Sequence, residues 1–483
     1  MSFVSDEQLL QLLFNTNKWW TTGKFPEAEK KETRRFAFYE AKKYLFNPKL
    51  KRAVLFTGLR RVGKTTILYQ LIEELLTKGV PAKNILYVSF DHPMIKICSI
   101  NRILDVFKNN VAQGEELYLF FDELHYAEEW NFWLKTLVDH YPYYKIAATG
   151  SASPLLAVKG AETGVGRWVD IKIPTLSFYE YCQLKKIPLP SLPATIKPTQ
   201  LHALKPSELT SVMHACSGLL PPFHRYLLIG GFPELALLDD LTLSQKLLRE
   251  DIVDKVLKRD MTAIYSIRNI NELEKLFIFL CLQSGNIITI QSLSQQLGTS
   301  RPTVENYIKL LSMANIIYIS DLIDNSGKKA LKSKPKIYLA DAAIRNAVLL
   351  KDESILADSD EMGMVVETAV YKHIAAFYYN QQPKVGYWRG GKKDKEIDVV
   401  VALPNGTKIL AEIKYRETID ISLEDGIVGQ AKDRNTWALI ITKKPTDYGT
   451  MTIPAANPLV KIPAFVFLFL LGHAEREGYR GCE

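Results

Sequence analysis

The chain has 483 residues and a formal net charge of +8 at pH 7, with 47% hydrophobic and 24% charged residues. Its length exceeds what a single hydrophobic core organises, so we expect roughly two to four domains of ordinary globular composition. The mild positive charge permits a nucleic-acid partner without requiring one. The five cysteines are scattered without a C-x-x-C pair, which argues against a zinc site and a disulfide framework and fits a reducing cytoplasm.

No stretch of the sequence has the pattern of a targeting or membrane-spanning segment. The first ten residues, MSFVSDEQLL, lack a basic region followed by an apolar core, so we expect no signal peptide. The most apolar run, residues 464–471, is much too short to cross a bilayer. Because Pro463 precedes this run and Gly472 follows it, we expect a buried strand there. These features predict a cytoplasmic protein without a membrane partner.

Residues 53–76 combine an apolar run, a loop with glycines and an amphipathic helix. The loop has the pattern G-x-x-x-x-G-K-T from Gly58 to Thr65, and the apolar residues that follow recur at helical spacing from Ile67 to Leu76. Glycines allow the backbone to wrap a phosphate chain, with its N–H groups and the helix N-terminus facing the anion. The alternative is a strand–helix turn with a chance lysine, but strand, loop and helix in register favour a P-loop.

The P-loop pattern assigns roles to its last residues. Lys64 is placed to reach the β- and γ-phosphates of a nucleoside triphosphate, and the hydroxyl of Thr65 is placed to bind Mg²⁺. The residues expected to contact the nucleotide are Gly58, Arg60, Arg61, Val62, Gly63, Lys64, Thr65 and Thr66. The sequence therefore predicts a bound nucleoside triphosphate together with Mg²⁺.

An apolar strand that ends in two carboxylates follows at residues 117–123, LYLFFDE. This segment resembles a Walker B motif, in which Asp122 would help to hold Mg²⁺ and Glu123 would polarise the attacking water as a general base. Alone, it would be an ordinary strand ending in acidic residues. Because it lies behind a P-loop, with a further strand at residues 84–90 between the two, we favour the functional interpretation.

The first domain has four apolar strands that alternate with helical segments. The strands are expected at residues 53–56, 84–90, 117–122 and 145–149. This alternation predicts an α/β fold with a doubly wound parallel sheet, whose ligand lies at the carboxyl ends of the strands. After the fourth strand, Ser151 best fits the sensor-1 position of AAA-type ATPases, and Thr149 is the second choice.

Arg167 ends a short GVGR segment at residues 164–167. An arginine shortly after sensor 1 could act as a finger on the γ-phosphate of a neighbouring subunit, and the protein would then be a homo-oligomer. It could equally be a solvated surface arginine, since short motifs of this kind often occur by chance. Both interpretations stay open at this point.

Residues 176–335 are mainly helical in pattern and contain two further motifs. The first, GGFPE at residues 230–234, resembles the G-x-P element of STAND-type ATPases, in which the proline contacts the adenine base. On this resemblance Pro233 would contact the nucleotide. The local alternative is a simple Gly–Pro turn.

The second motif is a helix-turn-helix followed by a wing. Helices are expected at Ile290–Leu297 and Arg301–Ala314, with Ser300 as the N-cap of the second helix. A strand at residues 316–323 and a basic segment at residues 328–336 follow as the wing. The side chains left exposed on the second helix are Arg301, Thr303, Asn306 and Lys309. They could contact a DNA groove, but a lid over the ATPase or a protein contact is an equal alternative.

The last part of the sequence contains a predicted β-hairpin whose turn sets its register. Residues 396–403 and 408–415 form its strands around a Pro-Asn-Gly turn. A two-residue loop would place Asp398 opposite Ile413, whereas a three-residue loop with the glycine in the left-handed conformation places it opposite Glu412. The second register gathers apolar side chains on one face of the hairpin and polar ones on the other, so we predict it.

The polar face of this hairpin carries the arrangement Asp…Glu-x-Lys on paired strands, formed by Asp398, Glu412 and Lys414. It resembles the core of PD-(D/E)xK nucleases, with Glu367 and Gln430 where such nucleases carry accessory residues. The residue before Asp398 is isoleucine, where the motif has proline. Asp398 and Glu412 would hold Mg²⁺, and Lys414 would position water or stabilise developing charge. An amphipathic hairpin with a solvated Glu–Lys pair is the alternative.

Together these motifs resemble a family of bacterial and archaeal AAA/STAND-like ATPases with a C-terminal restriction-endonuclease-like domain. The resemblance implies ATP rather than GTP and an α/β protein of three domains. These are the AAA ATPase core with N-terminal helices at residues 1–175, a helical lid and winged-helix domain at 176–335, and a nuclease-like domain at 336–483. It also implies ATP hydrolysis coupled to binding or processing of duplex or branched DNA. The alternative is a STAND-like signalling switch whose last domain is a non-catalytic interaction module.

Overall fold

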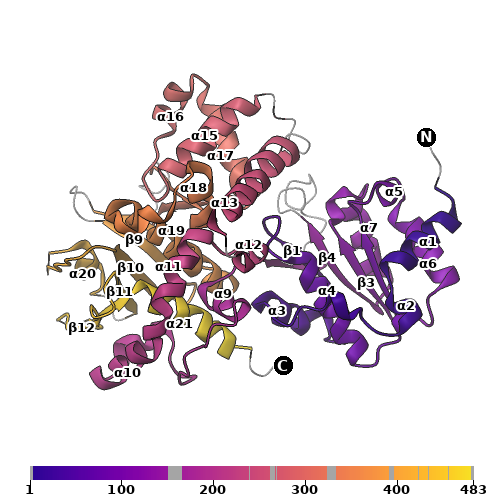
Figure 1. The fold of residues 1–483 in the computed structure, drawn as a ribbon, viewed down its shortest axis with the longest axis horizontal. Helices are drawn as coiled ribbons and strands as arrows, with labels where there is room; N and C mark the ends of the chain where they lie inside the picture. The colour runs from indigo at the N-terminus through magenta and orange to yellow at the C-terminus, as the bar shows by residue number, and fades with distance from the viewer. Residues whose placement is uncertain are drawn as a thin grey trace. The chain divides into compact units, whose positions relative to one another are not determined.

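The computed structural model describes residues 4–150, 166–238, 240–261, 267, 269–323, 333–390, 396–422, 424–432, 435–454 and 456–479. The chain forms two compact units (Figure 1). One comprises Met1–Ile173 together with Tyr479–Glu483, and the other comprises Pro174–Gly478. The predicted boundary at residue 335 falls inside the second unit, and the division into three domains stays a prediction.

The first unit contains a parallel five-stranded sheet in the order β2-β3-β4-β1-β5. Its strands are β1 (Ala53–Thr57), β2 (Ile85–Ser89), β3 (Leu117–Asp122), β4 (Tyr144–Gly150) and β5 (Trp168–Lys172). Every pairing between neighbours in this sheet is parallel. The predicted α/β fold with a parallel sheet is confirmed for this unit.

Strand β5 is absent from the sequence-based prediction. Its sequence, WVDIK, mixes charged and apolar residues, and only Ile171 is buried in it. An inner strand of a parallel sheet is marked by a continuous apolar run, and this edge strand has none. It nevertheless pairs along its whole length with β1, from Ala53 opposite Trp168 to Thr57 opposite Lys172.

Helices accompany this sheet on the chain segments between its strands (Figure 1). The α-helices of the first unit are α1 (Asp6–Thr16), α2 (Trp19–Thr22), α3 (Phe36–Leu45), α4 (Lys64–Thr77), α5 (Pro93–Lys96), α6 (Ile100–Asn110) and α7 (Trp130–His140). Short 3-10 helices span Glu27–Glu29, Ala82–Asn84 and Leu124–Tyr126. The apolar side chains of α4 at helical spacing, among them Ile67, Leu71 and Leu75, are buried, as their period predicts.

The segment that follows α1 covers the backbone of the edge strand β2. The Asn17 amide donates to the carbonyl oxygen of Tyr87 at 2.9 Å and accepts from its N–H at 2.7 Å. The indole nitrogens of Trp19 and Trp20 both donate to the carbonyl oxygen of Ile85, at 3.1 and 2.7 Å. An unpaired edge strand invites pairing with another chain, so these contacts protect this edge of the sheet.

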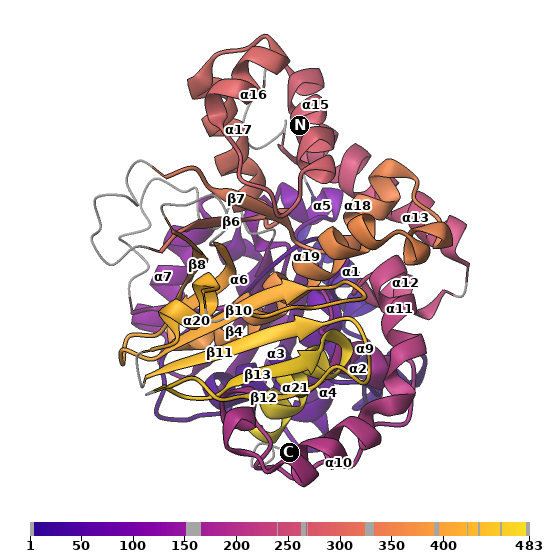
Figure 2. The ribbon, with the colours of Figure 1, turned by 90° about the vertical axis from the view of Figure 1, so that its left-hand side faces the viewer.

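The second unit contains a mixed eight-stranded sheet in the order β12-β13-β11-β10-β9-β8-β6-β7 (Figure 2). Its strands are β6 (Ile317–Leu322), β7 (Lys336–Leu339), β8 (Lys384–Arg389), β9 (Glu396–Ala402), β10 (Lys408–Lys414), β11 (Thr436–Thr442), β12 (Gly449–Met451) and β13 (Leu459–Pro463). Strand β9 is antiparallel to both of its neighbours, while β10, β11 and β13 are parallel. The mixed sheet fits an α/β domain, and its restriction-endonuclease-like identity stays a prediction.

Many helices surround this sheet in the second unit. The α-helices are α9 (Phe178–Leu184), α10 (Pro206–Cys216), α11 (Leu220–Ile229), α12 (Pro233–Leu237), α13 (Leu241–Arg249), α15 (Ile270–Leu282), α16 (Ile290–Leu297), α17 (Arg301–Met313), α18 (Ala342–Leu349), α19 (Ser359–Tyr378), α20 (Gly426–Gln430) and α21 (Ala464–Glu477). A π-helix spans Glu250–Asp260, and 3-10 helices span Pro198–Ala203, Ser217–Leu219, Glu353–Ala357 and Tyr379–Gln381.

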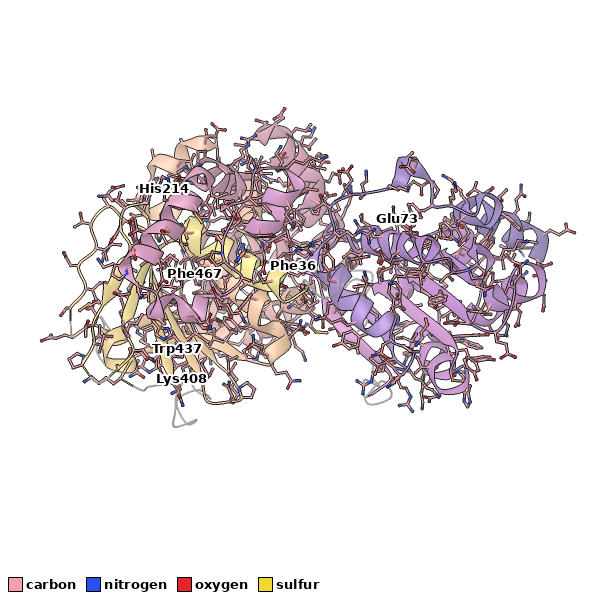
Figure 3. The ribbon with its side chains drawn as sticks, turned by 90° about the horizontal axis from the view of Figure 1, so that it is seen from below. Phe36, Glu73, His214, Lys408, Trp437 and Phe467 are labelled. Carbon is pink, nitrogen blue, oxygen red and sulfur yellow. The ribbon has the colours of Figure 1, made fainter. Side chains whose placement is uncertain are left out.

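The prediction of a buried strand at residues 464–471 is wrong, because these residues begin helix α21. Every residue from Ala464 to Ala474 is buried, including Phe467 in the interior of the second unit (Figure 3). A helix buried on all sides shows no polar face. Hydrophobic periodicity therefore cannot distinguish it from a short buried strand.

The predicted helix-turn-helix forms α16 and α17. The Ser300 hydroxyl accepts from the N–H of Thr303 at 3.3 Å, which confirms the predicted N-cap. The strands that follow, β6 and β7, are antiparallel, but β6 also pairs with β8, where Asp321 lies opposite Gly386. These strands therefore belong to the eight-stranded sheet. The basic segment lies largely outside the described residues, and a winged helix stays a prediction.

The β9–β10 hairpin has the predicted register. Val399 lies opposite Ala411, and the Gly406 N–H donates to the carbonyl oxygen of Leu403 at 3.0 Å with Gly406 at φ +85°. Continuing this register by one residue brings Asp398 opposite Glu412.

The hairpin face that carries Asp398 is not uniformly polar, contrary to the prediction. Val400 and Leu410 alternate with the charged residues on this face, and they are buried in a core with Ile427 and Val428 of α20. A helix after the hairpin covers part of this face, which the hairpin sequence alone does not reveal. The charged residues Asp398 and Glu412 lie farther along the same face.

Candidate functional site

The P-loop joins β1 to α4 through two glycines with special backbone conformations. Gly58 has φ +154°, and a Cβ at this position would lie 2.3 Å from the carbonyl oxygen of Ile173. Gly63 has φ +94° and is the N-cap of α4. Neither conformation suits a residue with a side chain. The turn presents the first N–H groups of α4, which have no partner within the helix, to the inside of the loop.

Lys64, the first residue of α4, is buried against this loop. Its Nζ donates to the carbonyl oxygens of Gly58 and Leu59 at 3.1 and 2.8 Å. These two contacts hold the ammonium over the loop backbone. A positive charge at this place, beside the N-terminus of a helix, is suited to the phosphate oxygens of a nucleotide.

Two arginines hold the loop to neighbouring parts of the unit. Arg35, which is buried, donates to the carbonyl oxygen of Val62 at 2.8 Å. Arg60 donates to the Tyr126 hydroxyl at 2.9 Å. Arg61, with φ +62°, is exposed. Among the predicted nucleotide contacts, Arg60 and Val62 thus also hold the loop to the rest of the unit.

Asp122, at the end of β3, accepts hydrogen bonds from three hydroxyl groups. Thr65 donates to its Oδ2 at 2.8 Å, Tyr87 donates to the same oxygen at 2.9 Å, and Thr149 donates to its Oδ1. Burial raises the pKa of Asp122, the Thr149 hydrogen bond opposes this, and the nearby Glu123 charge raises it further. Among the described residues, the side chains that donate to this carboxylate are neutral hydroxyl groups.

This arrangement fits a Mg²⁺ ion. Neighbouring ligands of an octahedral Mg²⁺ at about 2.1 Å lie about 3.0 Å from each other. The 2.8 Å between Thr65 Oγ1 and Asp122 Oδ2 is close to that separation, and both are the oxygen ligands that Mg²⁺ prefers. These two residues could therefore hold the ion, either directly or through its water ligands.

Glu123 follows Asp122 in a left-handed conformation with φ +50°. Its N–H donates to the Thr149 hydroxyl at 2.9 Å, and its Oε2 lies 3.3 Å from Nδ1 of the buried His125. Burial lowers the pKa of His125 to about 3, and the nearby Lys64 charge lowers it as well. A neutral imidazole beside the carboxylate leaves the charge of Glu123 in place.

The Thr149 hydroxyl contacts the Walker B carboxylate of Asp122. Ser151 lies outside the described residues, so its assignment to the sensor-1 position stays a prediction. Thr149 was the second choice, and it joins Asp122 to the backbone of Glu123. A polar residue at the carboxyl end of the strand next to β3 was the sequence signal for it.

Arg167 lies at the opposite edge of the sheet from the P-loop. Its carbonyl oxygen accepts from the N–H of Ala53 at 3.0 Å, at the amino ends of β1 and β5. Its guanidinium Nε is 2.9 Å from Asp139. Since both strands run away from this edge toward the loop, Arg167 does not reach the nucleotide site of its own chain. Its proposed action on a neighbouring subunit stays a prediction.

Pro233 begins α12 in the second unit, and its predicted contact with adenine stays a prediction. The two glycines before it have a packing role. Gly231 donates to Asp341 at 3.0 Å and accepts from the N–H of Leu176 at 2.7 Å. A Cβ on Gly231 would lie 2.5 Å from the Leu176 carbonyl oxygen. Close packing accounts for this glycine without a ligand.

Sequence reasoning missed Tyr87, His125 and Arg35 at this site. Tyr87 lies inside β2, and its hydroxyl reaches across to the neighbouring strand at Asp122. Arg35 reaches the loop from a distant part of the chain. Only His125, two residues after Glu123, had a sequence signal, because a short turn after the Walker B strand keeps it close.

The acidic residues of the second unit surround a lysine. Lys336 Nζ lies 2.5 Å from Glu396, 3.2 Å from Asp398 and 3.3 Å from Glu367. The Tyr338 hydroxyl also donates to Glu367 at 2.7 Å. Burial lowers the pKa of Lys336, but the three carboxylates outweigh it and raise the pKa overall. The lysine is therefore a permanent ammonium ion within the cluster.

Glu412 has a lysine partner of its own. Lys414 Nζ lies 3.0 Å from Glu412 and 3.8 Å from Asp425. Burial raises the pKa of Glu412, and the Lys414 charge opposes the shift. Gln430, expected as an accessory residue, ends α20.

The binding of Mg²⁺ by Asp398 and Glu412 stays a prediction. Asp398 and Glu412 are directed to ammonium groups, and Asp398 Oδ2 also accepts the N–H of Ile413 at 2.9 Å. Across the described part of the chain, no group of three or more Asp, Glu, His or Cys side chains is arranged to hold a metal ion.

Residues 50–182 match the family model described as an AAA domain. This match covers the P-loop, the Walker B strand and all five strands of the first sheet. Residues 50–182 are therefore similar to AAA-type domains, and the parallel sheet of the first unit lies within this match. Residues 221–354 and 362–461 match two models described as domains of unknown function, DUF8612 and DUF4143. Neither description names a nuclease.

Three curated proteins are similar to most of the chain. The uncharacterized protein MJ1544 of Methanocaldococcus jannaschii is 24% identical over 416 residues, which are 84% of this chain and 86% of that protein. MJ1637 of the same organism is 26% identical, covering 79% and 80%. An uncharacterized protein of Haemophilus influenzae is 26% identical, covering 65% and 73%. The similarity to the first two extends over both units.

Two solved structures were also compared with the chain. RuvB of Thermotoga maritima is 16% identical and covers 64% of this chain and 95% of its own, with a TM-score of 0.27. ORC1 of Aeropyrum pernix in complex with DNA is 14% identical and covers 69% and 96%, with a TM-score of 0.26. Scores of this size carry no inference about function.

Within the described residues, no helix combines the length and the apolar character needed to cross a membrane.

Proposed function

We propose that the first unit hydrolyses ATP in a reaction that depends on Mg²⁺. The observation that carries this proposal is the contact between two motifs that are distant in sequence. Thr65 at the start of α4 donates to Asp122 at the end of β3, 2.8 Å away. The hydroxyl of the P-loop and the Walker B carboxylate can thus share one cation. The preference for ATP over GTP follows from the family resemblance.

Each residue at this site has a distinct task. Bound ATP with Mg²⁺ supplies the reacting phosphate and the charge of the metal ion. Lys64 neutralises the phosphate oxygens, while Thr65 and Asp122 hold the ion. Glu123 accepts the proton of the attacking water. Thr149 fixes the backbone between the two acidic residues, and the neutral His125 lies 3.3 Å from the Glu123 carboxylate without cancelling its charge.

Two substitutions test this proposal in different ways. Lys64→Ala should abolish ATP binding, measured with a fluorescent nucleotide. Glu123→Gln should keep ATP binding and lower kcat by about 10²-fold or more, because it removes only a group that acts in the transition state. Lys83→Ala, at an exposed lysine of the same unit, is the matched control. Unchanged hydrolysis in both site variants would refute the proposal.

The proposed coupling to DNA involves α17 of the second unit. Arg301, Asn306 and Lys309 are exposed on this helix, as expected, while Thr303 bonds to the Ser300 cap. Glu305 is exposed on the same helix. Duplex or branched DNA should stimulate the ATPase with a steep dependence on salt.

The charges on α17 allow a matched test of DNA binding. The double variant Arg301→Ala, Lys309→Ala should weaken DNA binding, and Glu305→Gln should strengthen it. If the wild type retains no DNA at low salt, the alternative function is favoured, in which ATP binding switches a signalling surface and the last domain is an interaction module. Cleavage of DNA is not part of this proposal, because Lys336 occupies the acidic cluster.

A further inference from the structure

The acidic cluster of the last sheet is built around the ammonium of Lys336. This side chain is only 4% exposed, and its Nζ lies within 3.3 Å of Glu367, Glu396 and Asp398. Removing one partner of a buried salt bridge is strongly destabilising, because it leaves an uncompensated charge in the interior. The lysine therefore holds the carboxylates in place.

Three separate elements bring these groups together. Glu396 and Asp398 are two residues apart on β9, so they project from the same face of the strand. Glu367 comes from the middle of α19, and Lys336 is the first residue of β7. Lys336 is paired with Ser320 in the β6–β7 ladder, and its backbone is thus fixed within the sheet. The ammonium therefore belongs to a buried side chain whose backbone is held in the sheet, and not to a mobile surface lysine.

The position of this ammonium is that of a metal ion in a carboxylate site. Carboxylate oxygens around Mg²⁺ lie at about 2.0–2.1 Å from the ion, and around an ammonium they lie at about 2.7–2.9 Å. The separations here, from 2.5 to 3.3 Å, are those of an ammonium. A metal ion bound by the same three oxygen atoms, Glu367 Oε1, Glu396 Oε1 and Asp398 Oδ1, would have to occupy the place of the ammonium.

We infer that Lys336 is a built-in cation that takes the place of a divalent metal ion in the second unit. The domain keeps a nuclease-like hairpin, holds no metal there and does not cleave phosphodiesters. Glu412, the other carboxylate that the sequence pattern assigns to a metal, carries the Lys414 ammonium at 3.0 Å. Replacing Lys336 with a neutral residue creates a divalent-cation site formed by Glu367, Glu396 and Asp398. This inference does not depend on the proposed ATPase.

Manganese binding to the full chain tests the inference. The measurement is electron paramagnetic resonance of Mn²⁺ without nucleotide, in an Asp122→Asn background that removes the carboxylate of the ATPase site. With Lys336 present, we expect no Mn²⁺ bound at the cluster. Lys336→Met should bind one Mn²⁺ per chain. Lys336→Arg, which keeps the positive charge, should bind none.

A further pair of variants locates the ion. Lys336→Met combined with Asp398→Asn should lose the Mn²⁺ that Lys336→Met gained. Should Lys336→Met fail to fold, Lys336→Gln with Glu396→Gln removes one positive and one negative charge together. This variant keeps Glu367 and Asp398 and should bind Mn²⁺ more weakly than a three-carboxylate site. Circular dichroism establishes that each variant is folded.

Two outcomes would overturn the inference. One is Mn²⁺ bound by the chain with Lys336 intact and lost in Asp398→Asn, which would mean that the lysine yields its place to a metal ion. The other is a folded charge-removed variant that binds no Mn²⁺. Nicking of single-stranded, duplex or branched DNA with Mg²⁺ or Mn²⁺, lost in Asp398→Ala, would likewise exclude a metal-free domain.

Discussion

The two carboxylate sites of this protein differ in what surrounds the negative charge. In the first unit, Asp122 accepts hydrogen bonds from Thr65, Tyr87 and Thr149, all of them hydroxyl groups. In the second unit, the carboxylate of Asp398 lies against the Lys336 ammonium. Both sites lie at strand ends and both are largely buried.

This difference determines what each site can take up. Hydroxyl groups keep a carboxylate solvated without cancelling its charge, so a cation can still bind. An ammonium held between carboxylates already occupies their inward oxygen atoms, so another cation must displace it to bind the same atoms. Acidic residues at strand ends therefore do not by themselves indicate a metal site. Whether a carboxylate can bind a metal ion depends on the neighbouring hydrogen-bond donors, which come from other elements of the fold.

Removal of the internal cation should have the largest effect on stability. Lys336→Met leaves buried carboxylates without a partner and should lower the free energy of unfolding by about 3–5 kcal/mol. Lys83→Met, at an exposed lysine of the first unit, should change it by less than about 0.5 kcal/mol. Urea unfolding without added metal ions measures both. Equal stability of the two variants would mean that the cluster needs no cation.

Matched substitutions of the two aspartates should separate the sites by activity. Asp122→Asn weakens the hold on Mg²⁺ and should lower kcat for ATP hydrolysis by about 10²-fold or more. Asp398→Asn lies in the other unit and should leave the rate unchanged. Steady-state hydrolysis at saturating ATP is the measurement. A comparable loss from Asp398→Asn would show that the second cluster takes part in the ATPase cycle.

Glu367 of the second site should make the free energy of unfolding depend on pH. Burial and the nearby Asp398 charge raise the pKa of Glu367 from 4.5 to about 7. Between these values the folded chain holds a proton that the unfolded chain releases, so this residue makes stability rise as the pH falls from 7 to 4.5. The contribution amounts to at most about 3 kcal/mol.

Glu367→Gln cannot titrate and should lack this contribution. Urea unfolding at pH 5 and at pH 7.5, compared between wild type and variant, isolates it from the other groups. Identical pH dependence in the two proteins would place the Glu367 pKa at its ordinary value.

The substitution Arg167→Ala should change the free energy of unfolding least. Its pairing with Asp139 is partly exposed and is worth less than about 1 kcal/mol. If it acts on a neighbouring subunit, the ATPase rate per protomer should rise with protein concentration, and Arg167→Ala should lose this rise while keeping ATP affinity. A rate independent of concentration at a confirmed monomeric mass would exclude the finger.

The parts of the molecule that follow from sequence are those with local causes. The P-loop, the strand that ends at Asp122 and the turn at Gly406 each depend on neighbouring residues, and their structures are as predicted. The N-cap at Ser300 belongs to the same class. In each case the local structure depends on the preferences of residues only a few positions apart in the sequence.

The parts that sequence did not reveal depend on distant contacts. Lys336 was read as one of several basic residues in a wing, yet the fold buries it among carboxylates from two other elements. The sequence of helix α21 shows no helical alternation of apolar and polar residues, because its residues from Ala464 to Ala474 are all buried. Tyr87 became part of the nucleotide site only through the pairing of β2 with β3.

The strand order of the first sheet has a consequence for synthesis of the chain. β1 lies between β4 and β5, which are the last strands of this sheet to be made, and Gly58 packs on the carbonyl of Ile173, which comes after them. Domains fold during translation as their contacts become available, and distant pairings form late. A nascent chain that ends before β4 carries the whole P-loop motif but lacks both strands that pair with β1. We therefore expect the loop to take its folded position only after residues 144–173 have left the ribosome.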